Sequence, residues 1–206
     1  MINQRDFPAL FEVTQVPGLP IDATFVLLDD GFDERLVHSV YVVPFLASNE
    51  CIVVGFDTGE WSLPGGTLEA GEHWRAALER ELLEEAGARL LAYTPFAVLA
   101  CRSRTAPLRP HLPHPAYICL YGYGEVELVG PPTVPAGEEQ TVAVKAMPIE
   151  RAVAFLSRTG RRWETDLYRL AATLRQANTQ SDQLDQPYPH REFNEHTAAD
   201  PSDSLQ

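Results

Sequence analysis

The sequence predicts one α/β domain over residues 21–176, in which strands alternate with amphipathic helices. Two patterns predict it. Short segments rich in β-branched and aromatic residues are separated by turn residues, and other segments carry apolar residues at helical spacing. The composition agrees, because 45% apolar and 22% charged residues are ordinary for a globular protein. A length of 206 residues suits one domain with appendages.

Three strands are expected before the first long helix. Residues 24–28 end at an Asp-Asp-Gly turn, residues 36–47 are rich in β-branched and aromatic side chains, and residues 51–56 lead to a Gly-Gly turn. Pro44 lies inside the second of these segments. Because proline cannot donate a hydrogen bond to a ladder, it predicts an edge strand or a bulge at this point.

Three strands and two helices are expected in the second half of the chain. The strands occupy residues 89–102, 116–128 and 141–144, where β-branched and aromatic residues gather between turn residues. The helices span residues 149–157 and 163–176. The second helix carries an apolar stripe of leucine and alanine that can pack on a sheet.

Both ends of the chain are expected to lie outside this domain. Residues 1–20 contain three prolines and predict an irregular arm. Phe7, Leu10 and Phe11 can anchor the arm to the domain or to a second subunit, so a homodimer is one option. Residues 177–206 are too polar to offset the entropy of ordering, and they predict a disordered tail.

Charge, hydropathy and cysteine content exclude several classes of protein. A net charge of −13 argues against binding long nucleic acids, although a metal ion and local arginines can still attract a small polyphosphate. There is no run of eighteen apolar residues, so no membrane span is expected, and the N-terminus does not resemble a secretory signal. Cys51, Cys101 and Cys119 lack metal-type spacing and indicate reduced, buried thiols, so we expect a cytoplasmic protein.

The most informative segment runs from Gly66 to Ala88 and reads GTLEAGEHWRAALERELLEEAGA. After a Gly-Gly turn and a short loop, apolar residues recur at helical spacing as far as Gly87. A glycine suits the left-handed position that follows a helix. At about 100° per residue, Glu81, Glu84 and Glu85 fall in one sector of this helix.

Three glutamates in one sector are unfavourable in a free helix. Carboxylates three or four residues apart repel one another by roughly 0.2–0.5 kcal/mol per pair. They also lie near the C-terminus, where the helix dipole prefers cations. One interpretation is a solvated acidic face, the usual role of a charge run. The other is a divalent cation site, because Mg²⁺ takes hard oxygen ligands and removes both penalties.

The segment resembles the Nudix box. Gly66, Glu72 and the run from Arg80 to Ala88, RELLEEAGA, match every specified position of that motif at its spacing. The motif covers about a tenth of the chain and is far more restrictive than a lone glycine pattern. The resemblance implies a Nudix-type α/β/α sandwich around a mixed β-sheet, and the order of the expected strands agrees with it.

The resemblance also implies a chemistry and the residues that perform it. It implies hydrolysis of a nucleoside diphosphate linked to another group, with Mg²⁺ or Mn²⁺ as the cofactor. Arg80 and Glu72 would form an orienting ion pair beside the catalytic glutamates. The implied metal ligands are the Gly66 carbonyl and the carboxylates of Glu81, Glu84 and Glu85.

The sequence does not assign the general base that takes a proton from the attacking water. Glu84 and Glu85 are candidates inside the motif. Glu138 and Glu139, just before the last expected strand, are candidates outside it, and the alternative for these two is a solvated loop.

Three arginines in or near a proline-rich loop, residues 105–115, are candidates for substrate binding. A guanidinium fork suits a phosphate, so Arg102, Arg104 and Arg109 can hold the distal phosphate, with Glu139 as a further substrate-binding candidate. The alternative for each arginine is ordinary surface charge.

We therefore expect a metal-dependent pyrophosphohydrolase that cleaves a nucleoside triphosphate, a nucleotide sugar or a similar small diphosphate. The alternative outside enzymes is a Nudix module that binds a nucleotide without catalysis. A third interpretation is removal of pyrophosphate from triphosphorylated RNA ends. The complete set of metal-type glutamates favours an enzyme, whereas the acidic charge disfavours RNA. The sequence does not specify which diphosphate compound is cleaved.

Overall fold

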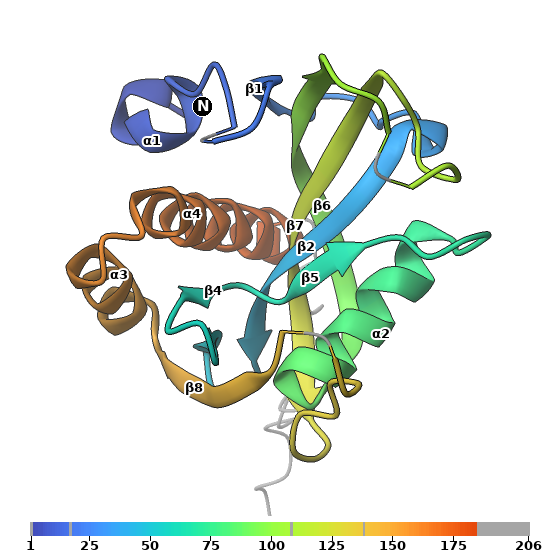
Figure 1. The fold of residues 1–206 in the computed structure, drawn as a ribbon. Helices are drawn as coiled ribbons and strands as arrows, with labels where there is room; N and C mark the ends of the chain where they lie inside the picture. Colours follow the sequence, from blue (N-terminus) through green and yellow to red (C-terminus); the bar gives the residue numbers. More distant parts are fainter. Residues whose placement is uncertain (1, 17, 108, 138, 185–206) are drawn as a thin grey trace, which may run out of the picture.

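A mixed β-sheet of eight strands forms the centre of the described part of the chain (Figure 1). The computed structural model describes residues 2–16, 18–107, 109–137 and 139–184. The strand order is β1-β6-β7-β2-β3-β4, with β5 paired to β2 and β8 paired to β3. β2 is parallel to β7, and the other pairs are antiparallel. The strands are β1 (Ile21–Leu27), β2 (Val37–Leu46), β3 (Glu50–Phe56), β4 (Trp61–Ser62), β5 (Gly65–Thr67), β6 (Ala88–Ser103), β7 (Ala116–Leu128) and β8 (Thr141–Pro148).

Helices cover both faces of this sheet, and an apolar cluster lies under each layer (Figure 1). On one face α2 packs against the sheet through Trp74, Leu78 and Leu82. On the other face α3 and α4 pack through Leu156 and Leu167. The fold is therefore the predicted α/β/α sandwich. The helices are η1 (Gln4–Asp6), α1 (Pro8–Phe11), η2 (Glu34–Leu36), α2 (Trp74–Ala86), α3 (Ile149–Arg158) and α4 (Arg162–Leu184).

The prediction that Pro44 marks an edge or a bulge is wrong. Pro44 lies in β2, which has β7 on one side and β5 and β3 on the other. Val42 donates its N–H to Pro64 O on the β5 side, and alternation along the strand directs position 44 to that side. There the partner of β2 changes from β5, whose pairing reaches Tyr41 opposite Gly65, to β3, which pairs with Phe45 through Cys51. The missing donor of proline therefore falls in a gap between two ladders.

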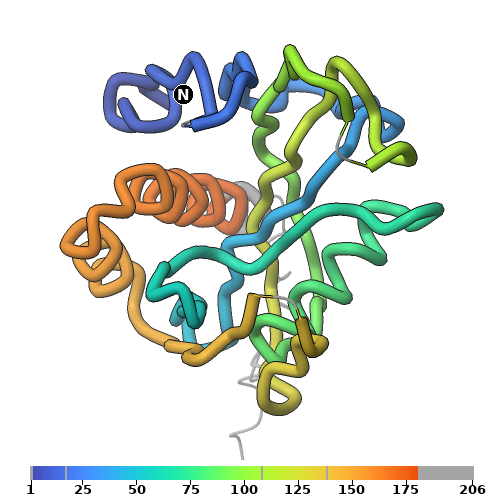
Figure 2. The backbone as a smooth tube through the Cα atoms, viewed as in Figure 1, coloured from blue at the N-terminus to red at the C-terminus, as the bar shows by residue number. Residues whose placement is uncertain are grey.

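The N-terminal arm is not irregular throughout, because it contains η1 and α1. Figure 2 shows this segment beside α4, on the face opposite α2. Phe7 and Leu10 are buried in the core, as the anchoring prediction required. The backbone N–H of Ala9 also donates to Asp166 Oδ2 of α4 at 2.9 Å. The arm thus anchors on its own domain.

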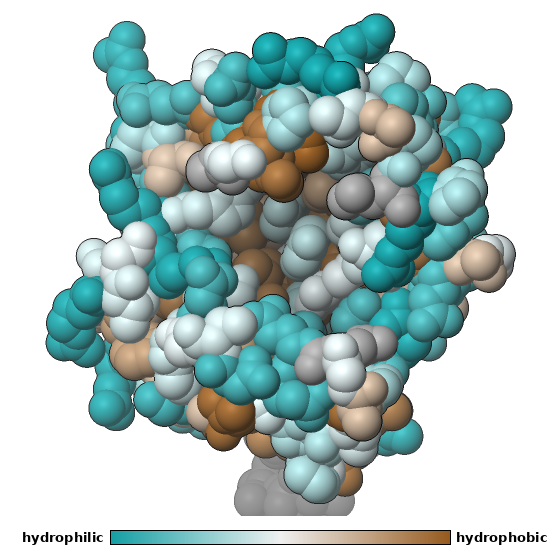
Figure 3. Space-filling view, viewed as in Figure 1, coloured by the Kyte–Doolittle hydropathy of each residue, from teal (hydrophilic) through white to brown (hydrophobic). Residues whose placement is uncertain are grey.

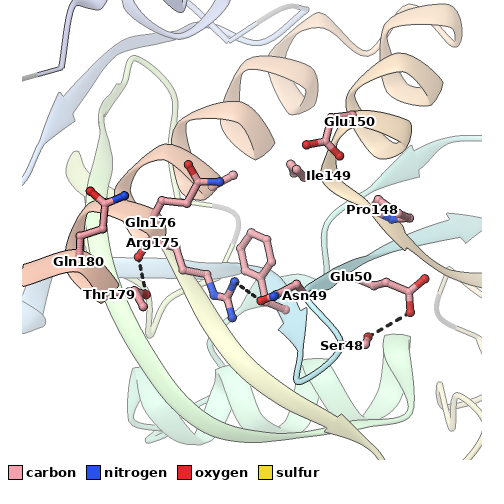
Figure 4. Close-up of a pocket in the computed structure, with 12 residues that line it drawn as sticks. Ser48, Asn49, Glu50, Pro148, Ile149, Glu150, Arg175, Gln176, Thr179 and Gln180 are labelled. Carbon is pink, nitrogen blue, oxygen red and sulfur yellow. Dashed lines mark hydrogen bonds between the residues drawn. The ribbon is translucent and has the colours of Figure 1, made fainter. Parts of the chain in front are cut away.

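The expected start of a disordered tail at residue 177 is also wrong, because α4 continues to Leu184. Arg175 fixes this part of the helix: its Nε and Nη2 donate to Glu125 at 2.6 and 3.0 Å, and its Nη1 donates to Asn49 (Figure 4). Asn178 then donates to the hydroxyl of Tyr123 at 2.7 Å. These side-chain contacts stabilise the helix beyond residue 176, and composition alone does not reveal them. The remainder of the predicted tail, residues 185–206, lies outside the described residues.

Two smaller expectations concern membranes and thiols. Within the described ranges, no helix is both long and apolar enough to cross a bilayer. Cys51, Cys101 and Cys119 are free, the first two are buried, and Cys119 is half-buried.

Candidate active site

Helix α2 provides the carboxylates of the candidate site. His73 caps its start, since the ring Nδ1 accepts from the N–H of Arg75 at 3.2 Å. Gly87 ends it in the left-handed conformation, with φ of 60°. A side chain at Gly87 would also collide with Gly130 O, since an added Cβ would lie 2.1 Å away. The helix is therefore held at both ends, which fixes the position of its last two turns.

The Gly65–Gly66 turn lies directly against this helix. Gly65 pairs with Tyr41 and Gly66 with Val40, so β5 is held on the central strand β2. Gly65 has a φ of 146°, and a Cβ there would lie 2.3 Å from Val40 O. A Cβ on Gly66 would lie 2.1 Å from Oε1 of Glu81. Two glycines are needed because only bare backbone fits between β2 and the Glu81 carboxylate.

Arg80 joins three of the glutamates. Its Nε and Nη2 donate to the two oxygens of Glu72, each at 3.0 Å, which is the predicted orienting pair. Its Nη1 donates to Glu81 at 2.9 Å and to Glu84 at 3.3 Å, and its Nη2 also donates to Thr67 O. The bond from Arg80 holds the pKa of Glu72 below its ordinary value. One guanidinium therefore faces three carboxylates and cannot neutralise them all.

Glu85 is half-buried and faces the Gly65–Gly66 turn. It accepts the backbone N–H of Gly65 at 2.9 Å. Burial raises its pKa to about 8; the bond from Gly65 opposes the rise, whereas the charges of Glu81, Glu139 and Glu84 add to it. Burial is therefore the main cause of the raised pKa, and the negative charges of the neighbouring carboxylates add a smaller contribution.

Glu139 reaches the same area from the loop before β8. Thr58 donates its hydroxyl to Glu139 at 2.7 Å, and the charge of Glu139 contributes to the raised pKa of Glu85. From the sequence, Glu139 was a candidate only by its position before the last expected strand. In the structure, Thr58 in the turn after β3 holds it near Glu85. Glu138, the other candidate outside the motif, lies outside the described residues.

The three candidate arginines do not converge on the glutamates. Arg102 is exposed on β6, and Arg104 forms an ion pair with Asp22 at 3.0 Å. Arg109 lies nearer to the box. Its charge adds to the effect of burial in lowering the pKa of His38, which shows that the two residues are close. In the same loop, the His111 ring contacts Leu68 O at 3.1 Å. The loop of residues 105–115 therefore borders the segment after β5, and of the three only Arg109 remains close to it.

Sequence reasoning missed several groups at this site: the N–H of Gly65, the carbonyl of Thr67, the hydroxyl of Thr58 and the ring of Tyr41. Tyr41 is buried close enough to Glu85 and Glu81 for their charges to add to the rise in its pKa, which burial dominates. Strand pairing across β2 brings these groups together. No local sequence pattern predicts that pairing. The residues that flank the Gly-Gly turn are the part of the sequence that could have indicated these groups.

The cluster fits a divalent cation by its donor chemistry. Three carboxylates contact one arginine and a fourth, Glu85, lies beside them. A bare glycine backbone adjoins Glu81, and the charges of Glu81, Glu139 and Glu84 add to the rise that burial produces in the pKa of Glu85. Hard oxygen donors of this kind are those that Mg²⁺ and Mn²⁺ take. Within the described residues, no three acidic, histidine or cysteine side chains already form a cation cage. At Glu81 and Glu84 the Nη1 of Arg80 contacts both carboxylates instead.

Beyond the glutamates, this face of the molecule is hollowed at its centre, and apolar surface forms the floor of the hollow (Figure 3). β5 borders the hollow, as the matching view in Figure 1 shows. Tyr41, which pairs with Gly65 of β5, stacks on Tyr121, with ring centroids 5.1 Å apart. The glutamate cluster thus lies beside a concave surface, the usual setting of a small-molecule site.

Comparison with known proteins identifies the family. A family model described as the NUDIX domain matches residues 36–170, so the chain belongs to the Nudix family. Among solved structures, a mutant of the Bacillus subtilis pyrophosphohydrolase BsRppH is 16% identical, with a TM-score of 0.45 over 61% of this chain and 72% of that chain. The MutT NUDIX hydrolase of Burkholderia pseudomallei is 17% identical, with a TM-score of 0.38 over 54% of this chain and 82% of that one. No curated protein matches the sequence.

Proposed function

We propose that this protein is a metal-dependent pyrophosphohydrolase that cleaves the diphosphate linkage of a small nucleoside diphosphate derivative. The observation that carries the proposal is the cluster of Glu81, Glu84 and Glu85 against the Gly65–Gly66 turn, with too little positive charge to balance it. A protein gains nothing in stability from such a cluster, so the cluster is best explained by a cation that completes it.

In this proposal, Glu81, Glu84, Glu85 and the Gly66 carbonyl hold Mg²⁺ or Mn²⁺. Bound there, the metal would supply positive charge against the phosphates and lower the pKa of a water. If the metal replaced Arg80 at Glu81 and Glu84, Arg80 would keep its position, because Glu72 holds its Nε and Nη2. Glu72 and Arg80 therefore orient the last turns of α2.

The attacking water needs a proton acceptor, and three carboxylates are candidates. Glu84 and Glu85 belong to the cluster, and Glu139 lies beside Glu85 on a different segment, held by Thr58. Of the three, Glu139 is the candidate that lies outside α2, so it can take a proton while the carboxylates of α2 hold the metal. Comparing the pH–rate profiles of Glu139→Gln and Glu85→Gln would separate these roles.

The second candidate function is a nucleotide-binding Nudix module without catalysis. The observation that favours catalysis over it is the energetic cost of keeping three carboxylates on one arginine, which binding alone does not require. A third option, hydrolysis of triphosphorylated RNA ends, has the net charge of −13 against it.

The test is a screen of nucleoside triphosphates, nucleotide sugars and dinucleotides with Mg²⁺ or Mn²⁺, following release of phosphate, pyrophosphate or nucleotide. We expect hydrolysis of at least one class, its loss in excess chelator and its recovery with added metal. Binding of a nucleotide without turnover would support the sensing module instead. Full activity in excess chelator would contradict the proposal.

A further inference from the structure

A groove between β8 and α3 gathers positive charge at some distance from the glutamate cluster. Its volume is about 820 Å³, and Lys145, Arg151 and Arg158 line it together with a single carboxylate, Glu150. In a chain with a net charge of −13, such a local surplus of cations is unexpected. Surface charge of one sign in a concave region attracts ligands of the other sign.

Aromatic rings hold the ammonium group of Lys145, the only lysine in the sequence. Its Nζ lies 4.2 Å from the centroid of the Trp61 ring and 4.7 Å from that of Phe155. The Trp61 ring lies flat enough on β3 that a Cβ at Gly55 would come within 2.9 Å of it. Cation–π contacts position an ammonium group but do not neutralise its charge. Lys145 is therefore fixed and still available to an anion.

The two arginines of the groove also keep their charge. Arg151 and Arg158 lie seven residues apart on α3, which is two turns and hence the same side of the helix. Both are exposed, and within the described residues neither has a carboxylate partner. Arg161, just beyond the groove, is different, because Glu60 and Glu164 both contact it. The groove thus presents one ammonium and two guanidinium groups against a single carboxylate, Glu150.

The groove lies one short strand away from the candidate active site. Trp61 opens β4 and Gly65 opens β5, and an extended chain rises about 3.3 Å per residue, so the backbone from Trp61 to Gly65 spans at most about 13 Å. β8 starts two residues after Glu139, which is near Glu85, and runs past β4 to α3 (Figure 1). The glutamates and the groove are therefore joined by two short segments of the chain.

We propose that this groove binds a second phosphate group of the substrate, one that is remote from the diphosphate linkage to be cleaved. The proposal rests on the proposed function and narrows it to substrates with such a remote phosphomonoester or phosphodiester. Guanidinium forks and an ammonium group suit phosphate oxygens, and the cavity has room for more than one phosphate. The acidic remainder of the surface keeps long polyanions away, so a compact ligand is favoured.

The direct test uses the single lysine as a reporter. Reductive methylation with ¹³C-formaldehyde retains the charge of Lys145 and gives it a resonance separate from that of the terminal amine. Inorganic pyrophosphate is then titrated into the full chain in excess chelator. We expect a saturable shift of the Lys145 resonance. The double variant Arg151→Gln, Arg158→Gln should weaken the apparent affinity at least tenfold, whereas the charge-matched control Arg5→Gln, Arg75→Gln should not.

The second arm compares substrates that differ only by the remote phosphate. Suitable pairs are NADH and NADPH, and dephospho-coenzyme A and coenzyme A. For the phosphorylated member, the double variant at Arg151 and Arg158 should raise KM about tenfold and leave kcat within about twofold. For the other member, neither constant should change.

Each result has a separate meaning. An unchanged Lys145 resonance overturns the anion site even if a diphosphate is hydrolysed. A shifted resonance without hydrolysis of any diphosphate supports the anion site and contradicts the proposed function. A shifted resonance with equal effects of the double variant on both members of every hydrolysed pair overturns the assignment to a remote phosphate.

Discussion

Arg80 and Arg175 are buried to the same degree but surrounded differently. The exposed fraction of the side chain is 24% for Arg80 and 21% for Arg175. Arg175 meets one carboxylate, Glu125, with the Asn49 amide alongside and the Phe45 ring 4.6 Å beneath it. Arg80 meets three carboxylates, and a fourth, Glu85, lies nearby.

The difference separates a structural contact from a functional one. The pair of Arg175 and Glu125 is balanced in charge, so its contribution is to hold α4 on the sheet. The cluster around Arg80 carries a net negative charge, and this charge destabilises the folded state until a cation binds. Ligand binding to the native state alone would return that free energy as added stability.

The largest expected effect is the loss of activity when the surplus carboxylates are removed. In Glu85→Gln and Glu84→Gln, hydrolysis of the best substrate should fall at least about 100-fold, because a major electrostatic interaction with the transition state is lost. The rise in Tm on adding Mg²⁺ should shrink as well. Glu79→Gln is the matched control, since Glu79 is exposed on another side of α2. Equal losses at Glu79 and Glu85 would remove the distinction between a site and an acidic face.

The next effect is the pH dependence of stability without metal. In the folded protein the pKa of Glu85 is about 8, whereas in the unfolded chain it returns to the ordinary glutamate pKa of 4.5. Between these limits the folded state binds more protons, so stability falls as the pH rises, by at most about 1.4 kcal/mol per pH unit. Urea unfolding in chelator should show this slope for the wild type relative to Glu85→Gln from pH 5 to 8. Parallel curves for the two proteins would contradict the buried state of Glu85.

The balanced pair should behave in the opposite way. Arg175→Met keeps the aliphatic stem but leaves Glu125 unpaired, so we expect a loss of about 1–3 kcal/mol and a Tm lower by several degrees. kcat and the gain in Tm with Mg²⁺ should remain as in the wild type. A fall in kcat at constant KM would show that α4 serves the site directly.

The smallest expected effect lies one turn beyond Arg175. Asn178→Ala removes the donor to the Tyr123 hydroxyl, which should cost about 1 kcal/mol, or a few degrees in Tm. Gln180→Ala, at an exposed position two residues later, should leave Tm unchanged. If Asn178→Ala also has no effect, the helix after residue 176 contributes nothing to the anchor that Arg175 begins.

The sequence predicted well those features that depend on local patterns. The bounds of α2 follow from its apolar stripe and from Gly87, and the strands agree closely with the segments rich in β-branched residues. The grouping of Arg80, Glu81 and Glu84 also follows from spacing on one helix, and that of Glu72 with them follows from the motif.

Features that depend on pairing between distant segments were not predictable. Pro44 is accepted in a central strand because its two neighbouring ladders meet there, and only tertiary structure reveals that gap. The last turns of α4 look like a polar tail until Arg175 and Asn178 find partners on other strands. Arg104 looked like a phosphate ligand because sequence does not show that Asp22 lies opposite β6.

The parallel pairing of β2 with β7 also has a consequence for synthesis. Val40 lies beside Leu120, about eighty residues later in the chain, so β2 leaves the ribosome long before its partner exists. At about 5–20 residues per second, this strand waits roughly 4–16 s. β2 is buried over most of its length in the finished protein, so during that interval it presents a largely apolar segment with unpaired backbone groups. Nascent chains of this protein should therefore be most prone to aggregation, and most dependent on chaperones, between the emergence of β2 and that of β7.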